Sequence, residues 1–138
     1  MDYGQVSDTP SGSFQQIATG GLFSCALESA GGIQCWGIDN GDADYDFGQV
    51  SDSPNGSFVQ LSSGALNSCA LDSSSQVQCW GSDDFGQSAV INGEFIQAVT
   101  GGSQSCGINM NGGVQCWGTP FLGDVLPESF RVWNGSVQ

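Results

Sequence analysis

Six cysteines carry the most specific chemical signal in this chain of 138 residues. They fall into three pairs whose members stand ten positions apart: Cys25 and Cys35, Cys69 and Cys79, and Cys106 and Cys116. Paired thiols form disulfides in an oxidising compartment, or they bind a metal such as zinc. Structural zinc sites typically use C-x-x-C spacing or histidine, and the sequence has neither. The pairs therefore predict three disulfides, with metal ligation as the weaker alternative.

The segments around the cysteines predict how each pair is positioned. Three near-copies of one segment contain them: SCALESAGGIQCWG from Ser24, SCALDSSSQVQCWG from Ser68 and SCGINMNGGVQCWG from Ser105. If the first copy folds as an antiparallel hairpin with Cys25 opposite Cys35, then Leu27 lies opposite Ile33 on the same face. Trp36 then falls on the other face, and the other two copies repeat this arrangement. Directly opposed cysteines can meet disulfide geometry, so the repeat favours bridges within each hairpin.

An acidic segment after the first hairpin is a second candidate site. Between Trp36 and Gly48 the chain reads GIDNGDADYDF, which is six residues longer than the matching segment of the second copy. Carboxylates here could surround a hard cation such as Ca²⁺, which accepts cages of oxygen ligands. The candidate ligands are Asp39, Asp42, Asp44 and Asp46. The spacing departs from the usual calcium-loop motif, because Gly48 comes one position late and no glutamate stands at the twelfth position. The segment is either a calcium site or a solvated acidic loop, and no other cofactor is predicted.

Composition restricts the partners and the chemistry. The chain has fourteen acidic residues, one arginine, no lysine and no histidine, for a formal net charge of −13. Phosphate groups are bound through Lys and Arg, so nucleic acid and anionic membrane surfaces are not expected partners. Membrane insertion is not expected either, because no apolar run is long enough to cross a bilayer. Without histidine or lysine, the usual triads and Schiff-base chemistry are unavailable. Two of the fourteen acidic residues could form a carboxylate pair for glycoside cleavage, which keeps an oligosaccharide-active enzyme as a third alternative, but nothing in the sequence singles out two of them. We therefore predict no catalytic residues and no enzyme activity.

The cysteine segments belong to longer repeats. Each follows a stretch of one pattern: GSFQQIATGG, GSFVQLSSGA or GEFIQAVTGG. A Gly-Gln pair comes after the first two copies, at 48–49 and 86–87. Four short strands per unit, separated by glycines, are typical of a propeller blade. We predict an all-β fold of β-propeller-type repeats in a single repeat domain, 1–138. Its four-stranded units span 12–50, 56–88 and 93–125, and its partial units span 2–11 and 128–138, where terminal strands complete a composite or intermolecular blade.

Tryptophans and glutamines recur at fixed positions in these units. The tryptophan of each C-W-G is expected to pack between blades rather than to line a ligand site. Recurring glutamines are expected to form repeated hydrogen bonds that satisfy buried polar groups. They are Gln16, Gln60 and Gln97 in the first stretch, and Gln34, Gln78 and Gln115 in the hairpin.

The pattern F-x-Q-(I/L)-x-x-G, S-C-A-L, G-x-(V/I)-x-C-W-G and G-Q resembles the regulator-of-chromosome-condensation repeat family. The resemblance spans nearly the whole chain, and it implies a β-propeller that serves as a binding platform. The histidine that the family often carries before S-C-A-L is replaced here by Phe23, Asn67 and Gln104. No residue specific to the family's nucleotide-exchange activity can be matched, so that activity is not implied. The paired cysteines resemble bacterial extracellular members.

The two ends of the chain suggest how the protein works. Residues 3–6 resemble the last strand of a preceding unit, and residues 130–138 resemble the first strand of a following one. Unpaired strand edges are templates for further strands. The candidate interface residues are Tyr3, Val6, Phe130, Val132 and Trp133. We predict a secreted or cell-surface structural module that forms homo-oligomers or filaments by strand exchange. The alternative is a soluble propeller module that binds a protein or a glycan, like an inhibitor or a lectin.

Overall fold

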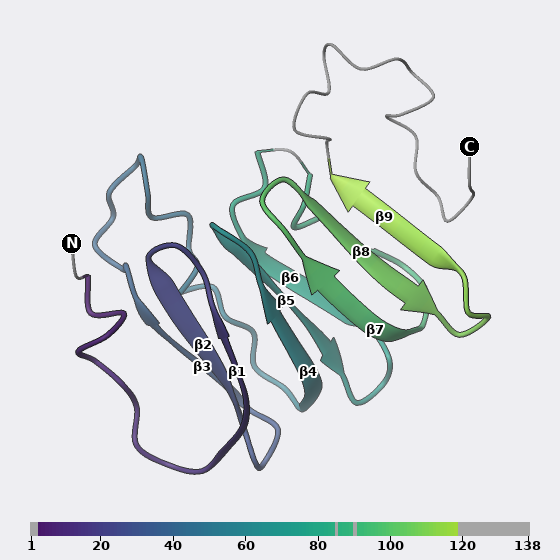
Figure 1. Ribbon diagram of the computed structural model, residues 1–138, viewed down its shortest axis with the longest axis horizontal. Helices are drawn as coiled ribbons and strands as arrows, with labels where there is room; N and C mark the ends of the chain where they lie inside the picture. The colour runs from purple at the N-terminus through teal and green to yellow at the C-terminus, as the bar shows by residue number, and fades with distance from the viewer. Residues whose placement is uncertain (1–2, 85, 90, 119–138) are drawn as a thin grey trace.

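Three antiparallel sheets make up the fold (Figure 1). The computed structural model describes residues 3–84, 86–89 and 91–118, and all regular structure in these ranges is β-strand. The first sheet contains β1 (Phe14–Thr19), β2 (Phe23–Glu28) and β3 (Ile33–Gly37). The second contains β4 (Phe58–Ser63), β5 (Asn67–Asp72) and β6 (Val77–Gly81), and the third contains β7 (Phe95–Thr100), β8 (Gln104–Asn109) and β9 (Val114–Gly118). The predicted all-β class is confirmed.

The hairpin register is the one that the cysteine spacing predicts. Cys25 lies opposite Cys35 in the β2–β3 pair, with Leu27 opposite Ile33 and Ser24 opposite Trp36. The β5–β6 and β8–β9 pairs repeat this register position by position. Side chains alternate between the two faces of a strand, so the cysteines and their aliphatic neighbours share one face and the tryptophan lies on the other.

The first strand of each sheet (β1, β4 or β7), which we call its outer strand, has a bulge near its start. This bulge determines which side chains of the strand face the neighbouring sheet. The register of β1 against β2 shifts between Phe14 and Gln16, and the same shift occurs in the second and third sheets. The extra residue reverses the alternation, so Phe14 and Ile17 fall on one face while Gln16 falls on the other. The F-x-Q-(I/L) pattern is therefore the sequence signal of a bulged strand.

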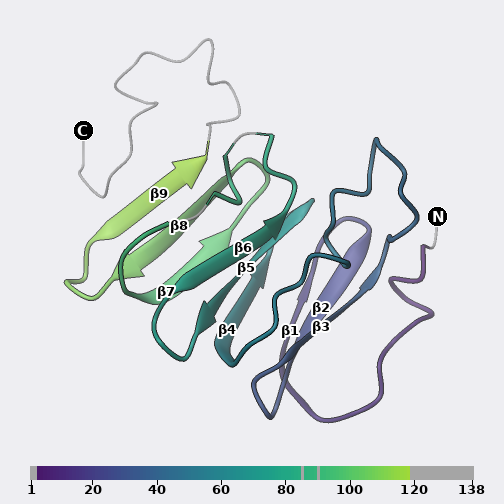
Figure 2. The same cartoon turned by 180° about the vertical axis from the view of Figure 1, so that it is seen from behind.

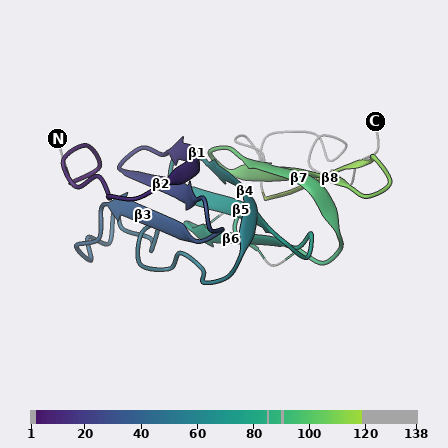
Figure 3. The same cartoon turned by 90° about the horizontal axis from the view of Figure 1, so that it is seen from below.

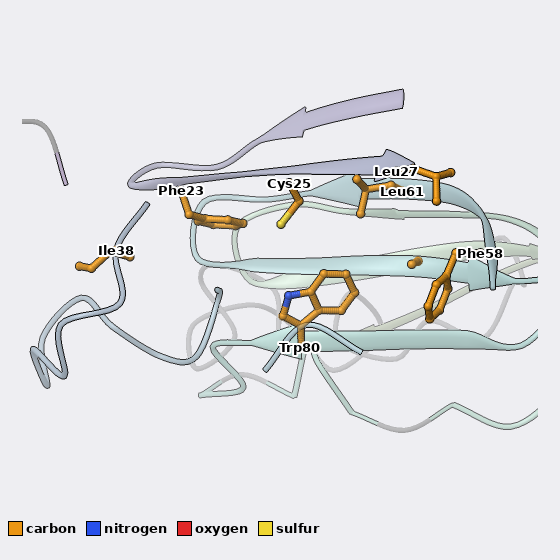
Figure 4. Packing of buried hydrophobic residues seen from close by; sticks show 8 residues of the cluster. Phe23, Cys25, Leu27, Ile38, Phe58, Leu61 and Trp80 are labelled. Atoms are coloured by element: carbon orange, nitrogen blue, oxygen red, sulfur yellow. The ribbon is translucent and has the colours of Figure 1, made fainter. Parts of the chain in front are cut away.

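The sheets stand side by side in chain order (Figures 2 and 3). The hydrophobic core lies between them. We call the face of a sheet that is turned toward the preceding sheet its leading face, and the opposite face its trailing face. Cys25 and Leu27 on the trailing face of the first sheet pack against the leading face of the second (Figure 4). That leading face presents Phe58, Leu61, Ala70 and Trp80. A second cluster joins Leu71 and Val77 of the second sheet to Phe95 and Ala98 of the third.

The prediction of four strands per unit was wrong for the described residues, because each sheet has three strands. The Gly-Gln segment that was expected to supply a further strand is a turn. Gly48 has φ 84°, a left-handed conformation that an extended strand excludes. Its carbonyl accepts a hydrogen bond from Asp52 N–H at 3.0 Å, which closes the turn. Gly4 has φ 96°, and its carbonyl accepts from Asp8 N–H at 2.9 Å, so residues 3–6 form the same turn and not the predicted strand.

Candidate functional site

All six cysteines are joined within their own hairpins. The three bridges are Cys25–Cys35, Cys69–Cys79 and Cys106–Cys116, and no cysteine is free. The paired Cα atoms are 4.0 Å apart in each bridge, close to the ~4.5 Å of directly opposed residues in a non-hydrogen-bonded antiparallel pair. Cys25 and Cys69 are fully buried between sheets. The bridges therefore act as internal crosslinks of the blades, and they leave no free thiol for other chemistry.

Each tryptophan of the C-W-G triplets is bonded to the Gly-Gln turn that precedes its sheet. The indole N–H of Trp36 donates to the carbonyl of Gln5 at 3.0 Å, and that of Trp80 donates to the carbonyl of Gln49 at 3.0 Å. Trp117 repeats the bond to Gln87 at 3.1 Å. The acceptor is a main-chain carbonyl, which every residue type has. The glutamine in the sequence therefore does not predict this hydrogen bond. The near-constant separations of 31, 31 and 30 residues between the two positions were the signal for it in the sequence.

In the first two Gly-Gln turns, the glutamine side chain has a separate role within the turn. The Gln49 side chain is fully buried, and its Oε1 accepts from Phe47 N–H at 2.6 Å. Its Nε2 donates to the carbonyl of Tyr45 at 2.7 Å. In the first turn, the Oε1 of Gln5 accepts from Tyr3 N–H at 2.5 Å. The side chain thus holds the turn while the carbonyl binds the tryptophan.

A second glutamine, in the outer strand, joins neighbouring sheets. The Nε2 of Gln16 donates to the carbonyl of Val59 at 3.2 Å, and its Oε1 accepts from Leu61 N–H at 3.0 Å. Gln60 repeats part of this contact, since its Oε1 accepts from Ala98 N–H at 2.7 Å. The predicted repeated hydrogen bonds are therefore present for Gln16 and Gln60. Both side chains extend from the trailing face of their own sheet to the first strand of the next sheet, Gln16 to β4 and Gln60 to β7.

A glycine in the turn between the first two strands lets consecutive sheets approach closely. A methyl group added at Gly64 would lie 1.9 Å from the carbonyl oxygen of Gly101, and one added at Gly20 would lie 2.7 Å from the carbonyl oxygen of Gly64. The separation at Gly64 is far below van der Waals contact, so this position has to be a glycine once the next sheet is in place. At Gly20 the added methyl group would also meet the Phe23 ring of its own sheet, which lies nearer than the Gly64 carbonyl. At Gly101 the same methyl group would meet its nearest atom, Gln104 Nε2, at 3.4 Å.

The first sheet presents an open leading face. Its positions correspond to those that Phe58, Leu61 and Trp80 fill in the second sheet, but here they line a cavity of about 450 Å³. Phe14, Ile17, Ala26 and Trp36 form its apolar floor. Ile17 is 69% exposed, whereas Leu61 at the equivalent position of the second sheet is 9% exposed.

Among the described residues, the third sheet presents an open trailing face. A cavity of about 210 Å³ lies on it, lined by residues that include Gln97, Val99, Cys106, Ile108 and Val114. Val114 is 45% exposed, whereas its equivalent in the second sheet, Val77, is 6% exposed. Cys106 is half-buried, unlike the fully buried Cys25 and Cys69.

The acidic loop uses several of its carboxylates for its own backbone. The two oxygens of Asp46 accept from Gly41 N–H at 2.7 Å and Gly48 N–H at 3.2 Å. Asp42 Oδ1 accepts from Asp44 N–H at 2.9 Å. Within the described ranges no three acidic or other metal-ligating side chains gather in a way that could hold a metal ion. Calcium binding by Asp39, Asp42, Asp44 and Asp46 stays a prediction.

Of the two predicted interfaces at the chain ends, only the N-terminal one lies within the described residues. Tyr3 is half-buried and packs against the first core cluster, whereas Val6 is 76% exposed. Because residues 3–6 form a turn bonded to Trp36 of the same chain, they do not present a free strand edge. Phe130, Val132 and Trp133 lie outside the described residues. Among the described residues, the structure contains no helix long and apolar enough to span a membrane.

Comparison with known proteins agrees with the repeat pattern and the fold. Residues 58–87 match the regulator of chromosome condensation (RCC1) repeat. The entire ectodomain of the receptor kinase CR4 from Physcomitrella patens superposes with a TM-score of 0.68 at 26% identity, over 86% of this chain and 33% of that one. The CRINKLY WD40 ectodomain of the Arabidopsis thaliana receptor kinase ACR4 gives a TM-score of 0.63 at 25% identity, over 81% and 41%.

A third similar structure is Prp20p from Saccharomyces cerevisiae, with a TM-score of 0.61 at 18% identity over 76% of this chain and 30% of that one. No curated protein sequence matches. The chain thus spans about a third of the length of the solved structures that it resembles. The propeller-type fold is confirmed by these likenesses, and within the described residues its sheets do not close into a ring.

Proposed function

We propose that this chain, which carries regulator-of-chromosome-condensation repeats, is a non-catalytic structural module that self-associates outside the cell. Among the described residues, the leading face of the first sheet and the trailing face of the third are open, whereas the equivalent faces between the sheets are buried, and this observation carries the proposal. Exposed apolar surfaces of this kind mark interaction sites in soluble proteins. The two open sheet faces of the described residues are therefore suited to join further protein surfaces.

The setting and the lack of catalysis are argued from residue chemistry. Three bridges that use every cysteine are stable in an oxidising compartment and rare in a reducing one. This favours a secreted or cell-surface location. The sequence has no histidine to act as a general base and no lysine to act as an amine nucleophile. The proposal is therefore one of binding and assembly.

Multi-angle light scattering of the oxidised protein tests self-association. We expect species larger than the 14.2 kDa monomer, with a mass that rises with protein concentration. Because the chain carries a net charge of −13, like-charge repulsion should weaken assembly at low salt, so the measurement is made over a range of ionic strength. A strict monomer at every concentration and salt level would contradict the proposal.

A second candidate function is binding of a protein or glycan ligand. The cavity on the first sheet favours it, because about 450 Å³ lined by Phe14 and Trp36 is within the size range of a ligand pocket. Prp20p, a protein of the same fold, is described with its binding properties toward Gsp1p and histones, which is a precedent for protein ligands. Glycan-array and protein-array binding by a monomeric preparation, lost on Trp36→Ala, would favour this function over self-association.

A further inference from the structure

We propose that the leading face of the first sheet docks on the trailing face of the third sheet of a second copy, head to tail. This contact would repeat the one made twice within the chain, between the first and second sheets and between the second and third. It rests on the proposed self-association and specifies its surfaces. It also replaces the terminal strands with whole sheet faces as the means of contact.

The leading face of the first sheet has the residues that fill the internal contacts. In the second sheet, Phe58 and Leu61 of β4 are buried against the first sheet. Phe14 and Ile17 hold the same positions in β1, on the same face of the strand and before and after the equivalent bulge. Phe14 is only half-buried and Ile17 is 69% exposed, since no sheet precedes them among the described residues. This face is thus an apolar surface without its counterpart.

The trailing face of the third sheet has the complementary residues. In the internal contacts it is a disulfide and an aliphatic pair that receive the next sheet, as Cys69, Leu71 and Val77 do. Cys106, Ile108 and Val114 hold these positions in the third sheet, and they line its open cavity. The two open faces therefore correspond to the two halves of one internal interface. The leading face has the aromatic and aliphatic residues of one half, and the trailing face has the disulfide and the aliphatic pair of the other.

A hydrogen-bonding group is already placed for the contact. Gln16 binds the carbonyl one residue after Phe58 and the N–H three residues after it. Gln97 holds the position of Gln16 in the third sheet, and its side chain is exposed. In the docked pair, Gln97 would bind the Gln15 carbonyl and the Ile17 N–H of the second copy. The apolar contact thereby acquires a fixed register.

The close approach at glycine also has its open counterpart. The carbonyl of Gly64 lies against Gly20, and the carbonyl of Gly101 lies against Gly64. At Gly101 a methyl group would make only ordinary van der Waals contact, nearest to Gln104 Nε2 at 3.4 Å, and among the described residues no carbonyl of a following sheet lies against it, so the carbonyl of Gly20 from a second copy can approach there. Gly101 is therefore a glycine that the isolated chain does not need but the docked pair does.

Charge agrees with the docking. None of the residues that line the two cavities is charged, although the chain has fourteen acidic residues. The two cavity linings therefore place no carboxylate in the contact. The remaining repulsion acts between exposed acids, which salt screens, so the association should strengthen as ionic strength rises. A head-to-tail contact of this kind closes into a ring or continues as a filament, according to its rotation.

Two groups of variants test the contact in the full chain. Ile17→Asp places a charge on the leading face of the first sheet. Gly101→Ala blocks the close approach at the trailing face of the third sheet, and Gln97→Glu removes the amide donor of that face. The matched control for Ile17→Asp is Ile96→Asp, because Ile96 is 56% exposed in β7 and lines neither cavity. All four positions lack tight contacts within the chain, and thermal unfolding at low protein concentration checks that each variant folds.

In light scattering, each face variant alone should be a monomer, whereas Ile96→Asp should assemble like the unmodified chain. An equal mixture of Ile17→Asp and Gly101→Ala should form a dimer and stop there, because each copy keeps one intact and complementary face. Assembly by either single variant would overturn the head-to-tail contact, because it would point to like faces or terminal strands, while leaving self-association in place. A monomeric unmodified chain would overturn both the head-to-tail contact and the proposed self-association.

Discussion

The indole N–H of Trp80 donates a 3.0 Å hydrogen bond to the carbonyl of Gln49, which lies 31 residues earlier in the chain. The bond joins the last strand of one sheet to the turn that precedes that sheet. Its equivalents at Trp36 and Trp117 show that the physical unit begins at a Gly-Gln turn and ends at C-W-G. Residues 4–37, 48–81 and 86–118 are three such units, whereas the sequence repeat was divided just after the Gly-Gln pair.

Replacing Trp80 by Phe tests this assignment. Trp80 is 5% exposed, so the substitution leaves the Gln49 carbonyl without its indole donor in a buried place. We expect the free energy of unfolding to fall by about 1–3 kcal/mol. Denaturant unfolding measures the loss, and Trp36→Phe is the matched control, because Trp36 is half-buried and water can replace its indole. An equal loss at both positions would argue against burial of the bond as the cause.

Replacing Gly64 by Ala tests the close approach of consecutive sheets. The added methyl group would lie 1.9 Å from the Gly101 carbonyl oxygen, so the second and third sheets must separate. Such overpacking typically costs about 1–3 kcal/mol. We expect a lower melting temperature for Gly64→Ala and an unchanged one for Gly101→Ala in the monomer, measured by thermal unfolding. Equal melting temperatures for the two variants would mean that the sheets do not approach as the structure has them.

The hairpins could be predicted residue by residue, but the number of strands could not. Opposed cysteines fix the register, and the alternation of a strand then assigns Leu27 and Trp36 to opposite faces. The Gly-Gln segment carries no such pattern. Whether it extends or turns depends on the left-handed backbone of Gly48 and on the two hydrogen bonds of the Gln49 side chain. A glycine allows both conformations, so the residue type alone does not decide between them.

The two open faces could not be predicted from the sequence either. Ile17, Leu61 and Ala98 are equivalent in the repeat, and nothing in their types separates an exposed position from a buried one. Their burial differs because the second and third sheets have a preceding sheet and the first has none among the described residues. The acidic loop is ambiguous for a different reason. An aspartate oxygen can bind a cation or accept a backbone N–H, and the residue type suits both.

Calcium titration distinguishes the two interpretations of the acidic loop. If the loop binds Ca²⁺, calorimetry should show heat of binding, the melting temperature should rise, and Asp44→Asn should remove both effects. Asp44 is the suitable position, because the oxygens of Asp46 and Asp42 Oδ1 already accept backbone N–H groups that close the loop. Absence of heat and of any melting shift, with the loop intact, would leave the carboxylates as acceptors for the loop itself.

Removing single bridges tests how the disulfides stabilise the blades. Each bridge closes a loop with a sequence separation of 10, for which chain entropy predicts about 2–3 kcal/mol of stabilisation. We expect the double variant Cys69→Ala, Cys79→Ala to lose more stability than Cys106→Ala, Cys116→Ala. Cys69 is fully buried against the third sheet, so its removal leaves a cavity as well, whereas Cys106 is half-buried on an open face.

Denaturant unfolding of both double variants in the monomer, with the oxidised and reduced parent chain beside them, measures these losses. Ellman titration verifies that the four remaining cysteines of each variant are still paired. Full reduction should cost at least the larger of the two losses and lower the melting temperature clearly, because three loops are released at once. A reduced chain with titratable thiols and an unchanged melting temperature would show that the packing between sheets holds the blades without the bridges.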